Sequence, residues 1–540
     1  MKWQSCYLFS CLLVTAGFAL PSRPSRPGGE PLQATFRAES FSEDSYLGWE
    51  LPPNPNSTHH LIFNSVSGLL QRWPNTLRRN GHSILPATIP TGTILYHGRT
   101  DDQVPDVPEW VAFDFDHAYL FCYQPCYVIS LQAKRDLRLV YFDGSSAAKM
   151  QDGPMDSQDV IAWGKPRPDK FLSERERIEI LCNWGKPLGL DGFVRMEFHF
   201  EVMLCDILDG LEIVTFFDVL PKNTTHPLRR PLANPLDPSS PPPWPTLPPT
   251  VPPPGWRGSL PSDAVSFFEA NVAGSWHDSA PGETRVRLDY AGLVTFYDEA
   301  LSSLIDARQE MTRLHHRLKG ISTEDAERVR TELETVLTRK KGRSAVDWAS
   351  IVRVVTERYA GRLEHLCFLL SSNSTFLDAV EQAAAARTQL LVALAPYITT
   401  MDVPQELPGS ANVSWAAPVV RRCATTQTSH ISLGPLTPQD ARIHAAVENT
   451  LHEICRRLVL VWLEFFDVEG ADEARAAGAI ELGRRHIDEL IGWLDWSSWV
   501  RCEPGCNTGE ICYLPSWPFL MKGDDPYDMT PRCISPENLI

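Results

Sequence analysis

The chain has 540 residues, of which 43% are apolar, and its formal net charge at pH 7 is −17. This length predicts two to four domains, and the apolar share is large enough to fill ordinary cores. A chain this acidic has no general electrostatic attraction to nucleic acid or to an anionic membrane surface, so we expect no nucleic-acid partner.

The N-terminus has the pattern of a secretory signal peptide over residues 1–19. Lys2 supplies a positive charge, an apolar run covers 7–20, and the small residues Gly17 and Ala19 suit a cleavage site. This run is shorter than the ~20 residues that a membrane span needs, and no later segment is apolar enough to span. We therefore predict a secreted, glycosylated protein. Four glycosylation sequons agree with export and begin at Asn56, Asn223, Asn373 and Asn412.

Residues 20–220 are predicted to form an α+β domain with a mixed or antiparallel sheet, because short β-branched or aromatic runs bounded by turn residues are typical of strands. The predicted strands are Ile94–His97, Tyr127–Gln132, Leu137–Phe142, Gly192–Cys205 and Leu211–Phe217. The predicted helices are Leu61–Trp73, His117–Cys122 and Ser173–Trp184. The last of these opens with a capping-box pattern formed by Ser173 and Glu176.

The segment 196–204 alternates cleanly between apolar and polar residues. On a single strand its apolar side chains would share the core face, and Glu197, His199 and Glu201 would share the other. That polar face is either ordinary solvent surface or the lining of a site.

Residues 221–262 contain fifteen prolines in forty-two positions. Proline removes a backbone donor and fixes φ, so this segment cannot form a helix or the interior of a sheet. We interpret it as a semi-rigid polyproline linker between two halves of different character. A Pro-rich stretch wrapped over the surface of one domain is the alternative.

Residues 263–496 are predicted to form an all-α helical bundle of five or six helices, because apolar residues recur there at three-to-four spacing. The helical segments are Tyr290–Leu318, Thr323–Thr338, Val346–Leu370, Thr375–Ile398, Pro438–Phe466 and Asp472–Trp493, with Ser344 and Asp472 as plausible caps. The pair His315-His316 is interpreted as solvated or half-buried, and no metal site is predicted.

Residues 497–540 form a tail rich in cysteine, tryptophan and proline. Cys502, Cys506, Cys512 and Cys533 could bind zinc, but in a secreted chain two disulfides are favoured. Eleven cysteines remain once the predicted signal peptide is removed, which is an odd number. One is then free or pairs with a second chain in a disulfide-linked dimer.

Three short motifs in the first half resemble the ADP-ribosyltransferase superfamily in its His-Tyr-Glu branch. Leu95-Tyr96-His97-Gly98 is similar to the first signature, an aromatic-His-Gly at the end of a strand. Residues 110–113 followed by 117–119 are similar to the aromatic strand and helix that come next. Residues 200–206 are similar to the third signature, a glutamate opening a hydrophobic strand.

The resemblance implies an ADP-ribosyltransferase-like fold and a site for NAD as substrate, with no permanently bound cofactor. His97 would orient ribose hydroxyls, and Glu201 would favour an oxocarbenium-like transition state. Tyr119 would complete the catalytic set, while Trp110 and Tyr96 would bind the nicotinamide. The tyrosine that the family carries on its second strand falls at Trp110 or Val111 here, and Glu197 competes with Glu201 for the acidic role.

Segments around 92–99, 141–149 and 191–197 also resemble a group of uncharacterised secreted fungal proteins. A second functional hypothesis is a glycoside hydrolase that uses Asp114 and Asp116 or other carboxylates. Two residues apart on a strand, these would lie ~6.6 Å apart, whereas Glu197 and Glu201 would lie ~13 Å apart and could not act as a pair unless the strand bends. A third hypothesis is a non-catalytic protein that binds the cell wall or an extracellular partner.

Overall fold

The computed structural model describes residues 48–536, except 224–250, 340–343, 345, 372–377, 405–412, 435, 467, 469, 471, 519–523 and 526. The residues from Gly48 onward belong to one compact unit. The predicted signal peptide, most of the Pro-rich segment, and the sequons at Asn373 and Asn412 lie outside the described residues.

The first half is built on a mixed sheet with the strand order β10-β1-β5-β6-β7-β3-β2-β4-β8, in which β9 also pairs with β1. Neighbouring strands are antiparallel except for the parallel pair β5 and β6. The strands are β1 Ser83–Ile89, β2 Ile94–Arg99, β3 Glu109–Ala112, β4 Tyr127–Ala133, β5 Leu137–Phe142, β6 Gly192–Met196, β7 Phe200–Leu204, β8 Leu211–Asp218, β9 Arg287–Leu288 and β10 Val294–Thr295. The predicted sheet-rich first half is confirmed.

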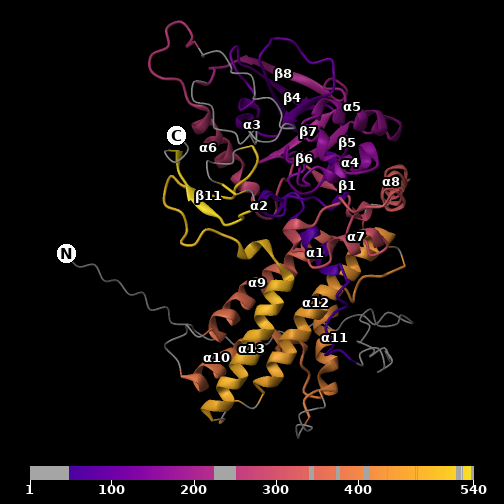
Figure 1. Cartoon of the computed structure of the whole chain (residues 1–540), viewed down its shortest axis with the longest axis vertical. Helices are drawn as coiled ribbons and strands as arrows, with labels where there is room; N and C mark the ends of the chain where they lie inside the picture. The colour runs from indigo at the N-terminus through magenta and orange to yellow at the C-terminus, as the bar shows by residue number, and fades with distance from the viewer. Residues whose placement is uncertain are drawn as a thin grey trace, which may run out of the picture. The chain divides into compact units, whose positions relative to one another are not determined.

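Helices α4, α5 and α8 cover one face of this sheet and share an apolar core with it. Helix α1 packs against α9 and α12 of the helical second half, which joins the two regions (Figure 1). The helices of the first group are α1 His59–Gly68, α2 Arg72–Leu77, α3 Phe115–Tyr119, α4 Asp156–Trp163, α5 Glu174–Gly185, α6 Asp263–Gly274, α7 Ser302–Arg308 and α8 Thr323–Thr338. Those of the second half are α9 Trp348–Leu370, α10 Ala379–Leu394, α11 Ala417–Thr425, α12 Pro438–Glu464 and α13 Glu473–Leu494. A helical region in the second half is therefore confirmed, although β9 and β10 of the range predicted as all-α, 263–496, belong to the sheet of the first half.

Side-chain caps explain where several helices begin. Asp472 accepts a hydrogen bond from the backbone N–H of Arg475 and caps α13, as predicted. The cap of α9 is Asp347 rather than Ser344, since its carboxylate accepts from the backbone N–H of Ser350 at 3.1 Å. The capping box predicted for α5 is wrong, because Ser173 makes no side-chain cap and the Glu176 carboxylate pairs with Lys170 instead.

The segment 192–205 is a hairpin and not the single strand that its alternation predicted. Strands β6 and β7 pair antiparallel with Arg195 opposite Glu201, and the backbone N–H of Glu197 donates to the His199 carbonyl at 3.0 Å. The turn contains no glycine, proline or asparagine, which is why the sequence did not reveal it. It brings Glu197 back toward Glu201.

The helix predicted over 290–318 is also wrong. This stretch forms the short strand β10, which pairs with β1 with Thr295 opposite Ser83, and then the separate helix α7. Leu293, Phe296 and Tyr297 are nearly fully buried. Their spacing therefore reflects burial at the edge of the sheet core and not one face of a helix.

The two ends of the Pro-rich segment meet. The backbone N–H of Asn223 donates to the Pro261 carbonyl at 2.8 Å, and Asn223 forms a parallel bridge with Ser262. Helix α6, which follows directly, packs on α3 of the first half. Residues 261–262, just before α6, thus lie beside Asn223.

Five disulfides link ten of the eleven cysteines from Cys122 onward. The two predicted in the tail are Cys502–Cys512 and Cys506–Cys533, beside the two-stranded pair β11 Ile511–Tyr513 and β12 Arg532–Ile534. The others are Cys122–Cys126, Cys182–Cys205 and Cys423–Cys455. Cys367 on α9 is free and half-buried, which accounts for the odd number.

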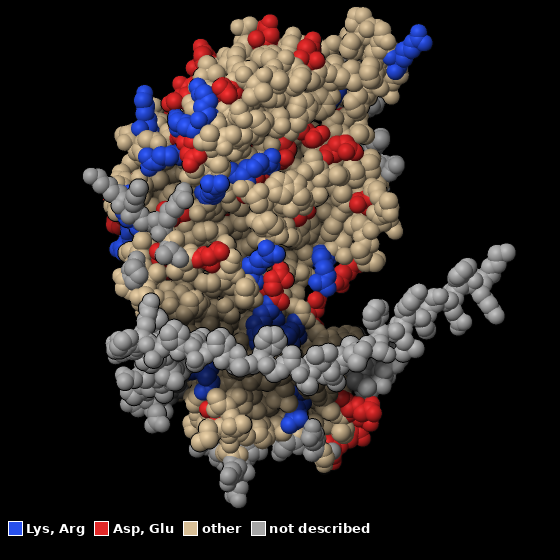
Figure 2. All heavy atoms as spheres, turned by 180° about the vertical axis from the view of Figure 1, so that it is seen from behind, with Lys and Arg blue, Asp and Glu red and all other residues tan. Residues whose placement is uncertain are grey.

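Basic and acidic side chains are intermixed on the face drawn in Figure 2. Among the described residues, no helix combines the length and the apolar character that crossing a bilayer requires.

We expect Gly274→Ala to destabilise the protein. Gly274 ends α6, and a Cβ there would lie only 1.8 Å from Cε1 of the buried His199 ring. Overpacking of this kind costs about 1–3 kcal/mol or more in free energy of unfolding. Gly478→Ala is the matched control, since a Cβ at this α13 position meets nothing within 4 Å. That change should be neutral or stabilising by up to ~1 kcal/mol. Denaturant unfolding of both variants checks this, and equal midpoints would contradict it.

Candidate functional site

A pocket of about 240 Å³ lies where strands β2, β3, β6 and β7 meet helices α3 and α5. Its lining includes Tyr96 and His97 on β2, Trp110 on β3, His117 on α3, Lys149, Glu174 on α5, Arg195 on β6 and Glu201 on β7. Aromatic walls with a few convergent polar groups are typical of small-molecule sites.

Four of the five residues predicted for the site line this pocket: Tyr96, His97, Trp110 and Glu201. Tyr119 does not line it. The Tyr119 hydroxyl donates to the Leu220 carbonyl at 2.7 Å, and its ring lies 5.3 Å from the Lys222 ammonium. Tyr119 thus ties α3 to the end of the sheet half.

Strand register explains why the predicted residues come together. Tyr96 lies opposite Ala112, and Ala112 lies opposite Glu201, so these residues form one row across β2, β3 and β7. Side chains in such a row share a face of the sheet. Trp110, two residues before Ala112, shares that face as well.

His97 follows Tyr96 and so lies outside this row. Its Nδ1 lies 2.6 Å from the Trp110 carbonyl oxygen, which can only accept, so Nδ1 carries the proton. Burial lowers the pKa of His97, against the opposing effect of the Glu109 carboxylate. A neutral ring with this tautomer leaves Nε2 as a hydrogen-bond acceptor.

Arg195 pairs with two carboxylates that line the pocket, those of Glu174 and Glu201. Its guanidinium is almost fully buried, donates from Nε to Glu201 Oε1 at 2.7 Å, and also pairs with Glu174. Burial alone would raise the pKa of Glu174, but Arg195 and Arg177 hold it at about 2. A buried charge that lost its partner would cost several kcal/mol, so this network fixes the positions of both carboxylates.

Lys149, which lines the pocket, contacts a carboxylate that also binds the C-terminal tail. Glu197 Oε1 accepts from Lys149 Nζ at 2.7 Å and from the Trp517 indole N–H at 3.0 Å. Although burial opposes it, Glu197, Glu174 and Glu201 raise the pKa of Lys149. No sequence signal linked Trp517 to a site more than 300 positions away.

The carboxylates of the glycoside hydrolase hypothesis, Asp114 and Asp116, do not line this pocket. Asp114 accepts from Arg285 at 3.2 Å and lies 3.7 Å from Nδ1 of the buried His199. Asp116 lies in the first turn of α3, where burial raises its pKa.

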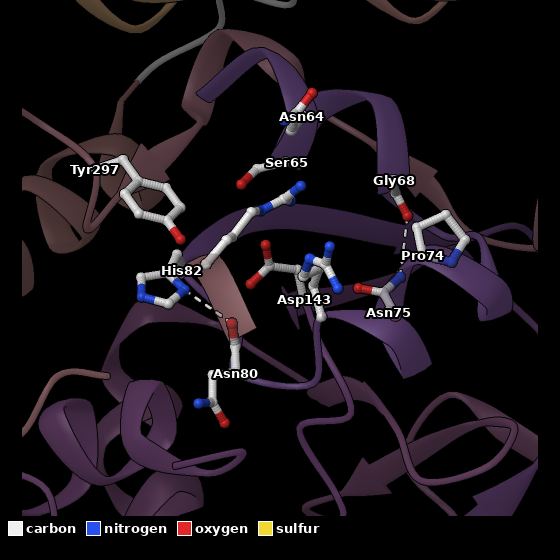
Figure 3. Close-up of a pocket in the computed structure, with 11 residues that line it drawn as sticks. Asn64, Ser65, Gly68, Pro74, Asn75, Asn80, His82, Asp143 and Tyr297 are labelled. Carbon is white, nitrogen blue, oxygen red and sulfur yellow. Dashed lines mark hydrogen bonds between the residues drawn. The ribbon is translucent and has the colours of Figure 1, made fainter. Parts of the chain in front are cut away.

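A second cavity, of about 20 Å³, is lined by polar side chains that include His82, Asp143 and Tyr297 (Figure 3). This volume is room for about one water molecule, so the cavity is too small for a substrate. His82 Nδ1 donates to the Asn80 carbonyl at 2.8 Å, and Asp143 Oδ1 accepts from the Ser83 backbone N–H at 2.7 Å. Burial raises the pKa of Asp143 to about 7.

This chain is similar to uncharacterized proteins of Saccharomyces cerevisiae. The family model described as the YPL277C N-terminal domain matches residues 54–127 and 124–234, a span that contains every residue lining the 240 Å³ pocket. The uncharacterized protein YOR389W of Saccharomyces cerevisiae is 26% identical over 542 residues, which cover 88% of this chain and 83% of that protein.

The uncharacterized protein YPL277C of the same yeast is 31% identical over 303 residues, covering 44% of this chain and 61% of that protein. No solved structure matches this chain. The predicted resemblance to uncharacterised fungal proteins is thus confirmed for yeast proteins.

The stability of the protein should depend on pH through Asp143. Its folded-state pKa of about 7 lies above the ordinary 3.8, so the folded state binds the extra proton between these values. The stabilisation is therefore present below about pH 4 and is lost as pH rises through 7, by roughly 4 kcal/mol in free energy of unfolding. Asp143→Asn keeps an oxygen acceptor and cannot ionise. Thermal midpoints of the two proteins should be similar at pH 5, with the variant higher at pH 8. Parallel curves would rule this out.

Proposed function

We propose that the 240 Å³ pocket binds NAD and cleaves its nicotinamide–ribose bond, transferring ADP-ribose to water or to an acceptor. The observation that supports this most is the neighbourhood of three strands, β7-β3-β2, whose residues Glu201, Trp110 and His97 line one pocket. These are the residues in which the sequence resembles the three signatures of the ADP-ribosyltransferase superfamily.

The chemistry of the pocket suits this reaction. Cleavage breaks the bond between the ribose carbon and the nicotinamide nitrogen, and the electron pair leaves with neutral nicotinamide. Positive charge then develops on the ribose, and the buried Glu201 carboxylate is fixed by Arg195 to stabilise it. Water or an acceptor hydroxyl then adds to the ribose carbon and loses its proton.

Trp110 and His97 supply groups for recognition. The Trp110 indole N–H is buried and makes no hydrogen bond among the described residues, so it can donate to the carboxamide oxygen of nicotinamide. His97 Nε2 can accept from a ribose hydroxyl. Arg175, whose guanidinium lies 4.7 Å from the centre of the Trp110 ring and is partly exposed, offers a cation to the diphosphate.

A second candidate is glycoside hydrolysis by Glu197 and Glu201. The β6–β7 turn removes the separation that a straight strand would impose. One oxygen of the Glu197 carboxylate lies within 4.8 Å of one oxygen of the Glu201 carboxylate. Retaining glycosidases hold their two carboxyl groups ~5 Å apart. Glu197 is, however, 2% exposed and tied to Lys149 and Trp517, which leaves it little access to a sugar.

We further propose that the protein is secreted, for which the five disulfides offer support because such bonds persist in oxidising compartments.

The first proposal is tested by measuring nicotinamide released from NAD by the full-length protein. Glu201→Gln should lower the rate at least ~100-fold, because it removes the charge opposite the developing cation. Glu212→Gln is the matched control, since Glu212 is exposed on β8 and should leave the rate unchanged. Release that is unchanged in Glu201→Gln, or absent from the wild type, would refute the proposal. Sugar release from a polysaccharide, lost in both Glu197→Gln and Glu201→Gln, would favour the second candidate.

A further inference from the structure

We propose a binding site for a divalent transition-metal ion at the edge of the 240 Å³ pocket, with His117, Glu197 and Glu201 as ligands. One ligand atom from each residue lies within 4.8 Å of the others. The three residues come from α3, from the β6–β7 turn and from β7, so only the fold brings them together. The proposal does not depend on the reaction proposed above.

Two buried polar atoms without a hydrogen-bond partner support the site. Glu197 Oε2 and His117 Nδ1 have no hydrogen-bond partner in the described part of the chain. Both residues are buried, Glu197 with 2% and His117 with 1% of its surface exposed. Buried polar atoms normally have a partner, and a missing one calls for a bound ion or water. The carboxylate oxygen has a lone pair to offer a cation, and Nδ1 has one in the tautomer that carries its proton on Nε2.

The other oxygen of each carboxylate is fixed. Glu197 Oε1 accepts from Lys149 and from the Trp517 indole, and Glu201 Oε1 accepts from Arg195. Glu197 Oε2 makes no hydrogen bond to any described residue. Carboxylate ligands are commonly oriented by hydrogen bonds of this kind around a metal. Glu174 pairs with both Arg195 and Arg177, so the network contains a third carboxylate and a third cation.

The donor set indicates the class of metal. One imidazole nitrogen and two carboxylate oxygens suit Zn²⁺, which binds such atoms at about 2.0–2.2 Å. Ligand atoms around such an ion stand about 3.3 Å apart, so small side-chain rotations from the present spacing would close the site. His117 and Glu201 line the pocket, which gives the ion a path from solvent and room for a bound water.

A neighbouring cluster of Asp114, His199 and His277 is also compact but fits a metal less well. Arg72 Nη1 lies 3.2 Å from His199 Nε2, and arginine can only donate. In the neutral ring Nδ1 then carries the proton and has no lone pair for a metal. Arg285 donates to one oxygen of Asp114, Oδ1, at 3.2 Å. Variants of this cluster therefore serve as controls.

The test is Zn²⁺ binding to chelator-treated, full-length protein, followed by competition with a chromophoric chelator. We expect one Zn²⁺ per chain and a dissociation constant raised at least ~100-fold in His117→Gln and in Glu197→Gln. Glutamine at position 197 keeps an acceptor for Lys149 and Trp517. His277→Gln should leave binding unchanged. Near-ultraviolet circular dichroism checks that each variant is folded.

Co²⁺ bound to the wild type provides a second measurement that needs no variant. Its visible spectrum should show nitrogen and oxygen ligands without thiolate charge-transfer bands. The proposal is overturned if the wild type binds no stoichiometric Zn²⁺, if binding survives in both His117→Gln and Glu197→Gln, or if only His277→Gln abolishes it. Zn²⁺ binding without nicotinamide release would support this site while refuting only the proposed reaction.

Discussion

The tight turn between β6 and β7 is the constraint on which the rest of the site depends. Its residues Glu197, Phe198 and His199 contact three different parts of the molecule. The Glu197 carboxylate meets Lys149 and Trp517, and Phe198 packs in an apolar cluster with residues of α6 and the C-terminal tail. His199 is seated against Gly274, with no room for even a methyl group between them. A single turn thus contacts Lys149 of the pocket lining, the C-terminal tail and α6.

Much of the fold could be predicted from local patterns, and the failures have physical causes. Strand β5 and helix α8 have the predicted bounds, because their apolar periods match the face that they bury. The β6–β7 turn was missed because buried residues continue through it and no turn-forming residue marks it. The stretch 290–318 was mistaken for a helix because core burial at the sheet edge imitates helical spacing.

Some residues of the candidate site could likewise be predicted from the sequence, and others could not. His97, Trp110 and Glu201 could be found because each lies in a short motif on a strand, and neighbouring strands bring the motifs together. Lys149 and Arg195 could not be found. Each carries an ordinary surface-type side chain, and only the tertiary fold buries it against carboxylates. An ion pair between residues far apart in the sequence produces no periodic pattern that could predict it.

The bridge between Asn223 and Ser262 has a consequence for how this protein can change over evolutionary time. Chain that departs and returns at one place can vary in length at little thermodynamic cost, because the entropy of closing a loop grows only with the logarithm of its length. Insertions and deletions there would leave the sheet, the pocket and the tail in register. Relatives could therefore differ widely in this segment and still share one architecture.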